Sequence, residues 1–349
     1  MRFAPAGPAT EEGPALHAIT MNTHTYPRLV GDIGGTNARF AWVAQPGEAP
    51  ADMAVYPVRS LPTLADAIRR YLADQGKPPP RWCAIGIANP ITGDQVRMTN
   101  HDWSFSISAL RRELGLERLL LVNDFTALAL SLPALAGEDL RQVGPGAPAP
   151  DAALAVIGPG TGLGVSGLLP APSGREWVPL NGEGGHVTLP AQDAREAAVV
   201  ARLHERFGHA SAERAVSGLG LENLYQVLCQ LDGVPPRALD APAIADDAKA
   251  GRDPQCVEAL ALFCAFLGSV AGNLALTLGA RGGVYIGGGI VPRLGEAFDR
   301  SAFRVRFESK GRFTGYLRAI PTYVVQARAP ALLGAARALD VLPDPPFVR

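Results

Sequence analysis

The run Leu29–Phe40, with the sequence Leu-Val-Gly-Asp-Ile-Gly-Gly-Thr-Asn-Ala-Arg-Phe, constrains the fold more than any other part of the chain. Apolar residues lead into an acid and a glycine pair, and apolar residues then resume. Glycine lets a backbone turn tightly and lets a ligand approach without a Cβ in the way. Exposed N–H groups in such a turn can bind phosphate. We therefore predict a strand, a phosphate-binding turn and a second strand, with the turn at Gly34, Gly35, Thr36 and Asn37.

Asp32 stands beside this turn. Its carboxylate could hold Mg²⁺, directly or through water, because hard cations prefer oxygen ligands. Two similar motifs do not fit: a dinucleotide fingerprint needs three spaced glycines that open a helix, and a P-loop needs a lysine. From this segment alone, a hairpin turn without a ligand remains the alternative.

Two further glycine clusters follow. Residues 154–165 repeat the pattern of strand, turn and strand, and the turn contains Gly160, Thr161, Gly162 and Gly164. The third cluster, Gly287, Gly288 and Gly289, follows an apolar strand and precedes Pro292, a favourable residue for the first turn of a helix. Backbone donors at a helix N-terminus suit a nucleotide. Two hairpins of this kind, one in each half, indicate two related domains that face each other across a cleft.

The remaining patterns alternate between strand and helix, which predicts an α/β fold. Apolar spacing over residues 64–72 predicts a helix that ends near Gly76, and residues 82–88 and 119–122 are typical of buried strands. With 349 residues the chain is long enough for two domains. The Pro/Gly/Ala-rich stretch 133–150 is typical of a connection between them.

Composition and charge exclude several classes of function. A net charge of −1 offers no electrostatic case for binding nucleic acid or acidic membranes. The four cysteines show no Cys-x-x-Cys spacing, so we expect reduced, mostly buried thiols in a cytosolic protein.

The stretch 259–280 carries no charge and is long enough to span a bilayer. It contains three polar residues, and we expect a long helix buried between the domains. For residues 300–318, which mix basic and aromatic residues, we expect a solvated amphipathic segment.

Candidate chemical groups lie at Asn123–Asp124 and in the loop 180–187. The carboxyl end of a strand in such a sheet faces the crevice where ligands bind. A buried aspartate there can take or orient a hydroxyl proton during phosphoryl transfer. The alternative is a helix N-cap, and both roles can coexist. In the loop, two glycines between Glu183 and His186 exclude a helical metal motif, so these side chains suit the hydroxyls of a polyol. Glu213 could be another acceptor or a partner of Arg214 on the surface.

Taken together, these segments resemble the bacterial glucokinases of the hexokinase-like superfamily, which shares its fold with actin. The resemblance runs from about residue 28 to residue 339, nearly the whole chain. The motifs that carry it are Gly31–Arg39, Pro90–Gly93, Met98–His101, Asn123–Thr126, Gly160–Gly164, Gly182–His186, Gly208–His209, Ser211–Arg214 and Gly287–Arg293. Asn89, Pro159 and Leu219 depart from the family's usual residues, and they put local loop shape in question rather than activity.

The resemblance implies two actin-like, ribonuclease-H-like α/β domains that flank a ligand cleft. The smaller domain would comprise residues 28–134 and 327–349 and the larger residues 135–326. Residues 1–27 lie outside the resemblance; because the first 20 are rich in Ala, Pro and Gly, we expect a disordered extension, or a choice of start site upstream of Met21. The implied activity transfers the γ-phosphoryl group of Mg-ATP to the 6-hydroxyl of glucose, giving glucose 6-phosphate and ADP, the first step of glycolysis. The enzyme would be a cytoplasmic homodimer with no nucleic-acid or membrane partner.

The resemblance also implies roles for individual residues. Asp124 would be the general base on the 6-hydroxyl. The other glucose ligands would be Asn100, Asn123, Glu183, His186 and Glu213. Asp32 would organise Mg²⁺ through water, and the first two glycine turns would hold the phosphates, with Gly287–Gly289 near the adenosine. A kinase for another sugar, a sugar-binding repressor and an actin-like assembly ATPase remain alternatives at this stage.

Overall fold

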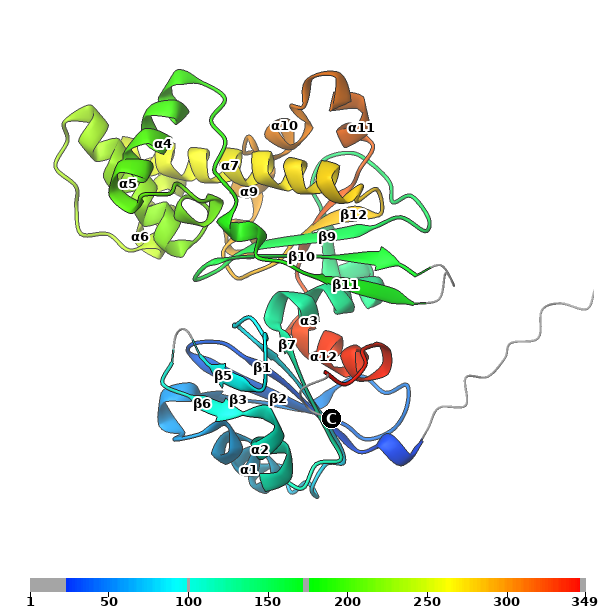
Figure 1. Ribbon diagram of the computed structural model, residues 1–349. Coiled ribbons are helices and arrows are strands. Elements are labelled where there is room, and N and C mark those ends of the chain that lie inside the picture. Colours follow the sequence, from blue (N-terminus) through cyan, green and yellow to red (C-terminus); the bar gives the residue numbers. More distant parts are fainter. Residues whose placement is uncertain (1–22, 99–100, 172–175, 346–349) are drawn as a thin grey trace, which may run out of the picture.

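Two mixed β-sheets form the centres of the two halves of the molecule (Figure 1). The structure, a computed structural model, describes residues 23–98, 101–171 and 176–345. The expected disordered extension lies mostly outside these ranges. Residues Thr23–Thr25 form a 3-10 turn, and Thr25 is buried and accepts a hydrogen bond from Arg28, so the ordered chain begins before the first strand.

The two sheets repeat one topology. The first sheet has the order β3-β2-β1-β4-β7. Its strands are β1 (Arg28–Ile33), β2 (Asn37–Val43), β3 (Ala51–Pro57), β4 (Trp82–Ile87) and β7 (Arg118–Asn123). The second sheet has the order β11-β10-β9-β12-β13-β8. Its strands are β8 (Leu140–Gln142), β9 (Leu154–Pro159), β10 (Leu163–Pro170), β11 (Trp177–Asn181), β12 (Gly283–Ile286) and β13 (Thr322–Val325). In both sheets an antiparallel hairpin precedes two parallel strands, so the predicted relation between the two halves is confirmed.

Helices cover both faces of the first sheet. On one face lie α1 (Leu64–Asp74) and α2 (Ile107–Glu113), together with the ribbon of β5 (Gln95–Arg97) and β6 (Ser104–Ser106). On the other face, between the two sheets, lie α3 (Asp124–Ser131) and α12 (Pro330–Val341) (Figure 1). One hydrophobic core joins these helices to both sheets, with Val30 and Leu120 from the first and Val156 and Leu168 from the second.

The second half carries the larger set of helices. They are α4 (Ala194–Phe207), α5 (Gly218–Asp232), α6 (Ala241–Lys249), α7 (Pro254–Leu278), α8 (Val291–Leu294), α9 (Glu296–Asp299), α10 (Phe303–Glu308) and α11 (Thr314–Arg318). The stretch predicted to lie between the domains is α7, and that placement is wrong. The helix crosses the second half and packs against α5, α6, α10 and β9 (Figure 1). It is long and apolar enough to cross a membrane, but 72% of its most apolar window is buried in the fold.

The stretch 300–318 is amphipathic, as predicted, but only part of it is solvated: residues 311–315 are exposed, whereas several residues of α10 are buried. Phe303 and Phe307 are fully buried, and the guanidinium of Arg304 donates to the backbone carbonyl oxygens of Ile320 and Arg318. Arg306 forms an ion pair with the buried Glu196. The cause is that α10 lies directly on α7, and a buried cation whose N–H groups have acceptors, such as Arg304, produces the same sequence pattern as a solvated one.

Candidate active site

The turn between β1 and β2 has the shape expected of a ligand-binding turn. The N–H of Gly34 donates to the carbonyl oxygen of Asn37 over 3.0 Å, which closes the hairpin. Neither Gly34 nor Gly35 has a positive φ, so glycine is not needed here for a left-handed turn. A Cβ at Gly34 would have only the carbonyl oxygen of Asn37 within 4 Å, at 3.8 Å. The missing side chain therefore leaves open space above the backbone.

The other glycines of the predicted nucleotide site divide into two groups. At Gly160 and Gly289, as at Gly34, a Cβ would meet nothing closer than 3.8 Å, so these positions keep space for a ligand. The second group is filled by the protein itself: Gly162 by the Glu213 carboxylate, Gly164 by the ring of Phe125, Gly287 by Leu128 and Gly288 by the Pro159 carbonyl group. Only the first group has the open backbone that a phosphate or nucleoside would need. The helix predicted after Gly289 is short, the four residues of α8.

Asn123 and Asp124 lie at the junction between β7 and α3 and make different hydrogen bonds. The Oδ1 atom of Asn123 accepts hydrogen bonds from the N–H groups of Phe125 (2.9 Å) and Thr126 (3.3 Å), so Asn123 is the N-cap. Asp124 is the first residue of the helix and accepts from the Phe125 N–H over 2.9 Å. The N-cap of α3 is therefore Asn123, as the structural alternative predicted. Capping does not explain why residue 124 is a carboxylate.

Burial raises the pKa of two carboxylates at this site, Asp124 and Asp32. For Asp124, burial acts together with the negative charges of Asp32 and Glu183 and against hydrogen bonds from the backbone, and the resulting pKa is about 6. For Asp32, Arg39 opposes the rise in pKa through an ion pair of 3.0 Å. A carboxylate with a pKa near 6 is ionised at neutral pH and is still basic enough to accept a proton in a transition state.

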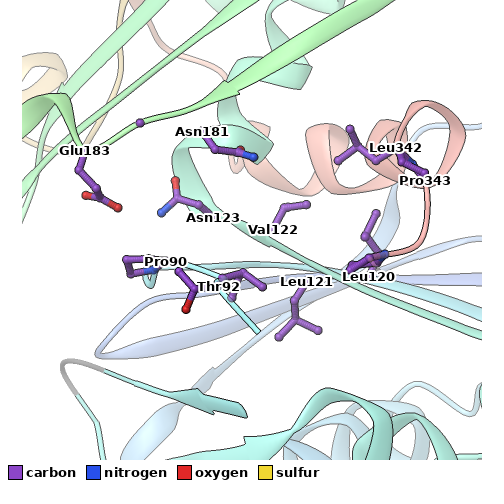
Figure 2. Close-up of a pocket in the computed structure, with 13 residues that line it drawn as sticks. Pro90, Thr92, Leu120, Leu121, Val122, Asn123, Asn181, Glu183, Leu342 and Pro343 are labelled. Carbon is purple, nitrogen blue, oxygen red and sulfur yellow. The ribbon is translucent and has the colours of Figure 1, made fainter. Parts of the chain in front are cut away.

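Two cavities meet at this junction. The first, of about 450 Å³, is lined by Pro90–Thr92, Leu120–Asn123, Asn181–Glu183 and the C-terminal residues Leu342, Pro343 and Pro345. Figure 2 shows the side chains of Glu183 and Asn123 pointing toward the same space, with Pro90 and Thr92 beneath them. The second cavity, of about 530 Å³, is lined by Asp32, Arg39, Asp124, Phe125, Gly287–Gly289 and the start of α12. Consecutive residues at the end of β7 thus line different cavities.

The remaining predicted sugar ligands lie on two neighbouring 3-10 turns of the second half. Glu183 and His186 are exposed, and the His186 carbonyl oxygen lies 3.1 Å from Nε2 of His209. Glu213 accepts a hydrogen bond from the N–H of Leu163 over 2.9 Å, so its carboxylate lies against the glycine turn rather than beside Arg214. The Arg214 guanidinium instead lies over the ring of Phe207. Asn100 lies outside the described residues.

Nearly the whole chain that carries this site is similar to known proteins. Residues 29–341 match the family model named Glucokinase.

The chain belongs to the glucokinase family. It is 59% identical over 317 residues to the glucokinase of Aromatoleum aromaticum, an alignment that covers 90% of this chain and 95% of the relative. A crystal structure of glucokinase from an Antarctic psychrotroph is 34% identical, with a TM-score of 0.82 and coverage of 90% of this chain and 98% of that one. A glucokinase of the ROK family from Streptomyces griseus, solved with glucose and AMPPNP, is 20% identical, with a TM-score of 0.59 and coverage of 89% and 98%, and shows the fold alone.

For this glucokinase-family chain, several predictions are thereby settled. The family, the actin-like two-domain α/β fold and the assignment to ATP-dependent glucose kinases are confirmed. The repressor and assembly-ATPase alternatives are set aside. The domain limits and the roles of individual residues stay predictions, although the structure brings Asp32 and Glu183 close enough to Asp124 to raise its pKa.

Three residues of this site were missed from the sequence. Arg39 pairs with Asp32, and a strict hairpin register around the predicted turn would have placed the two opposite each other. Asn181 lines the first cavity and accepts a hydrogen bond from Thr126 over 2.8 Å, and it lies only two residues before Glu183. Phe125 had no signal of its own, because its partners lie in a distant hairpin.

The donor set agrees with a hydrated Mg²⁺ rather than a caged metal. Among the residues that the structure describes, no group of three or more His, Cys, Asp or Glu side chains could hold a metal ion. Mg²⁺ usually keeps several waters and binds through one or two carboxylates plus substrate phosphates. The partly buried carboxylate of Asp32, next to an open glycine turn, fits that mode.

Proposed function

We propose that Asp124 is the general base with which this glucokinase-family enzyme transfers the γ-phosphoryl group of Mg-ATP to the 6-hydroxyl of glucose. The observation that carries the proposal is a buried carboxylate with a pKa of about 6 at the junction of two cavities. Asp124 accepts the hydroxyl proton while the 6-oxygen attacks the γ-phosphorus. The bond from this phosphorus to the bridging oxygen breaks, and ADP leaves with that oxygen.

We assign the first cavity to the sugar and the second to the nucleotide. Asn123 and Glu183 face the first cavity from opposite halves, and amide and carboxylate groups suit hydroxyls that both donate and accept. His186, Glu213 and Asn100 complete the proposed sugar ligands. For the nucleotide, the turns at Gly34–Asn37 and Gly160–Gly164 hold the phosphates, and Gly287–Gly289 lie near the adenosine. The open backbone at Gly34, Gly160 and Gly289 supports this assignment, as does the glucose and AMPPNP bound to a neighbour of the same fold.

Charge on the phosphates is balanced by groups of the chain and by the metal. Asp32 would hold Mg²⁺ through water, and the bound ion would stabilise the charge that spreads over the transferring group. Arg39 favours the ionised form of the Asp32 carboxylate and orients it through their ion pair. Closure of the two halves over the sugar would exclude water and limit the hydrolysis of ATP.

We further assign the protein to the cytoplasm, as a homodimer at the first step of glycolysis. Four free, buried cysteines support a reducing compartment. We also keep the domain limits proposed above, because α12 packs on α3, β1 and β4 and so returns residues after 327 to the first half. Size-exclusion chromatography with light scattering tests the oligomeric state.

Two variants and a sugar panel test the function. We expect Mg-ATP consumption to depend on glucose, with little response to galactose or fructose. Asp124→Ala should lower kcat by about 10²- to 10⁴-fold, the usual range for a lost general base. The matched control is Asp246→Ala, an exposed residue of α6 paired only with Lys249, which should keep the wild-type rate. An Asp124→Ala variant that retains more than about a tenth of the rate would contradict the base assignment.

A further inference from the structure

Helix α3 joins the catalytic carboxylate to both sheets. It lies between them (Figure 1) and contacts β4 and β7 of the first sheet and β9, β10 and β11 of the second. Its first three residues are Asp124, Phe125 and Thr126. The position of Asp124 relative to the opposite half therefore depends on how the next two side chains are seated.

The ring of Phe125 packs against the second sheet at two glycines, Gly158 and Gly164. A Cβ at Gly164, on β10, would lie 1.9 Å from the ring atom Cδ2, and a Cβ at Gly158, on β9, would lie 2.8 Å from Cζ. Real Cβ atoms do not approach so closely, so both positions must be glycine for the ring to fit. The ring also borders the cavity that holds Asp32 and Asp124.

On its other side, α3 packs closely against α12 and β4. A Cβ at Gly334 of α12 would lie 1.6 Å from the carbonyl oxygen of Ala127, and a Cβ at Gly86 of β4 would lie 3.1 Å from the Cβ of Ala127. The hydroxyl of Thr126 adds a link to the second half, since it donates to Oδ1 of Asn181 over 2.8 Å. The helix has little room to move between these contacts.

We propose that Phe125 is a positioning residue for phosphoryl transfer. Its ring, seated on Gly158 and Gly164, holds the Asp124 carboxylate at a set distance from the phosphate turn that begins at Gly160. The reasoning is steric: Gly164 belongs to the same turn-and-strand unit as the phosphate site, so the ring couples the base directly to it. Displacement of reacting groups by about 1 Å can cost about 10² in rate. This proposal rests on the proposed function of Asp124.

A double-mutant cycle tests the coupling. Gly164→Ala should displace the ring and lower kcat by about 100-fold, with KM for glucose changed less than about threefold, because no sugar ligand is altered. Phe125→Ala, which removes the ring and its Cγ atom, should lower kcat about tenfold. In the double variant the new methyl group occupies space that the ring has left, because the three ring atoms that it would meet are gone. We therefore expect the double variant to match Phe125→Ala rather than show the product of the two losses.

Gly167→Ala is the matched control, since the same substitution on the same strand would place a Cβ 2.8 Å from Leu278, away from α3. It should lower stability and leave kcat unchanged. Full kcat in Gly164→Ala, or additive losses in the double variant, would overturn the proposal. If Gly164→Ala does not fold, an unchanged kcat in Phe125→Ala would overturn it, and a loss in kcat at constant KM would support it. Activity in Asp124→Ala would instead reject the proposed function itself.

Discussion

Replacing Asp124 by asparagine should stabilise the folded protein while it removes turnover. The carboxylate is largely buried, and the negative charges of Asp32 and Glu183 lie near it, so its ionised form is unfavourable in the folded state. Asparagine has nearly the same shape and keeps an Oδ1 atom that can accept the N–H of Phe125, as Asp124 does. The substitution therefore removes a charge with little change in packing.

The size of the effect follows from the pKa. Burial raises the pKa of Asp124 from 3.8 to about 6, so the folded state binds this proton more tightly than the unfolded state does. The charge then destabilises the fold fully above about pH 6, and this cost declines as the pH falls through 6 and vanishes below 3.8. The difference corresponds to at most about 3 kcal/mol at pH 8 and about half of that at pH 5. Asparagine does not titrate and avoids the cost at both values.

Urea unfolding followed by circular dichroism at pH 8 and pH 5 measures the difference. We expect Asp124→Asn to raise the free energy of unfolding by about 1 to 3 kcal/mol at pH 8, and by about half as much at pH 5. Asp246→Asn, at an exposed ion pair, should change it by less than about 0.5 kcal/mol at either pH. The reasoning fails if Asp124→Asn is no more stable than the wild type at pH 8, or if its gain is the same at pH 5.

Four other substitutions follow from the same structure. Gly334→Ala should lower the free energy of unfolding by more than about 2 kcal/mol, because its Cβ would lie 1.6 Å from a carbonyl oxygen of α3. Gly315→Ala on α11, where a Cβ would have no atom within 4 Å, should raise the free energy of unfolding by up to about 1 kcal/mol. Equal effects of Gly334→Ala and Gly315→Ala in urea unfolding would contradict the packing argument. Ala329→Gly should raise the thermal midpoint, since Ala329 has a φ of 53° at the start of α12; a lower midpoint would speak against strain there. Glu183→Gln should raise KM for glucose at least about tenfold with a smaller change in kcat, and steady-state kinetics with an unchanged KM would remove it from the sugar site.

Local patterns predicted much of the fold. The helix expected over residues 64–72 is α1, Leu64–Asp74, and the two glycine hairpins are β1–β2 and β9–β10. These features depend on neighbours in the sequence: strand alternation, a capping residue and a turn. The N-cap at Asn123 is of the same kind. Such signals were sufficient to place Asp124 at the end of a strand facing the cleft.

Features that depend on distant partners were not predictable in the same way. The apolar length of α7 indicates burial, but whether it lies between domains or within one depends on which helices pack on it. Arg304 is charged in any environment, and only the fold brings the carbonyl oxygens of Ile320 and Arg318 to its guanidinium. The connection at 133–150 contributes an edge strand, β8, because β13 offers it a partner.

The glycines show why motif and mechanism need separate arguments. One property, the absence of a Cβ, serves two purposes that the sequence does not distinguish. At Gly34 and Gly160 the space stays open toward the cleft, whereas at Gly164 and Gly334 helix α3 fills it. A side chain added at an open glycine should weaken nucleotide binding and leave stability nearly unchanged. A side chain added at Gly334 should displace the helix that carries Asp124, and so reduce both stability and kcat although Gly334 is none of the proposed ligands. Under the proposed function, the open glycines of this chain form part of the nucleotide site, whereas glycines such as Gly164 and Gly334 make room for the helix that carries Asp124.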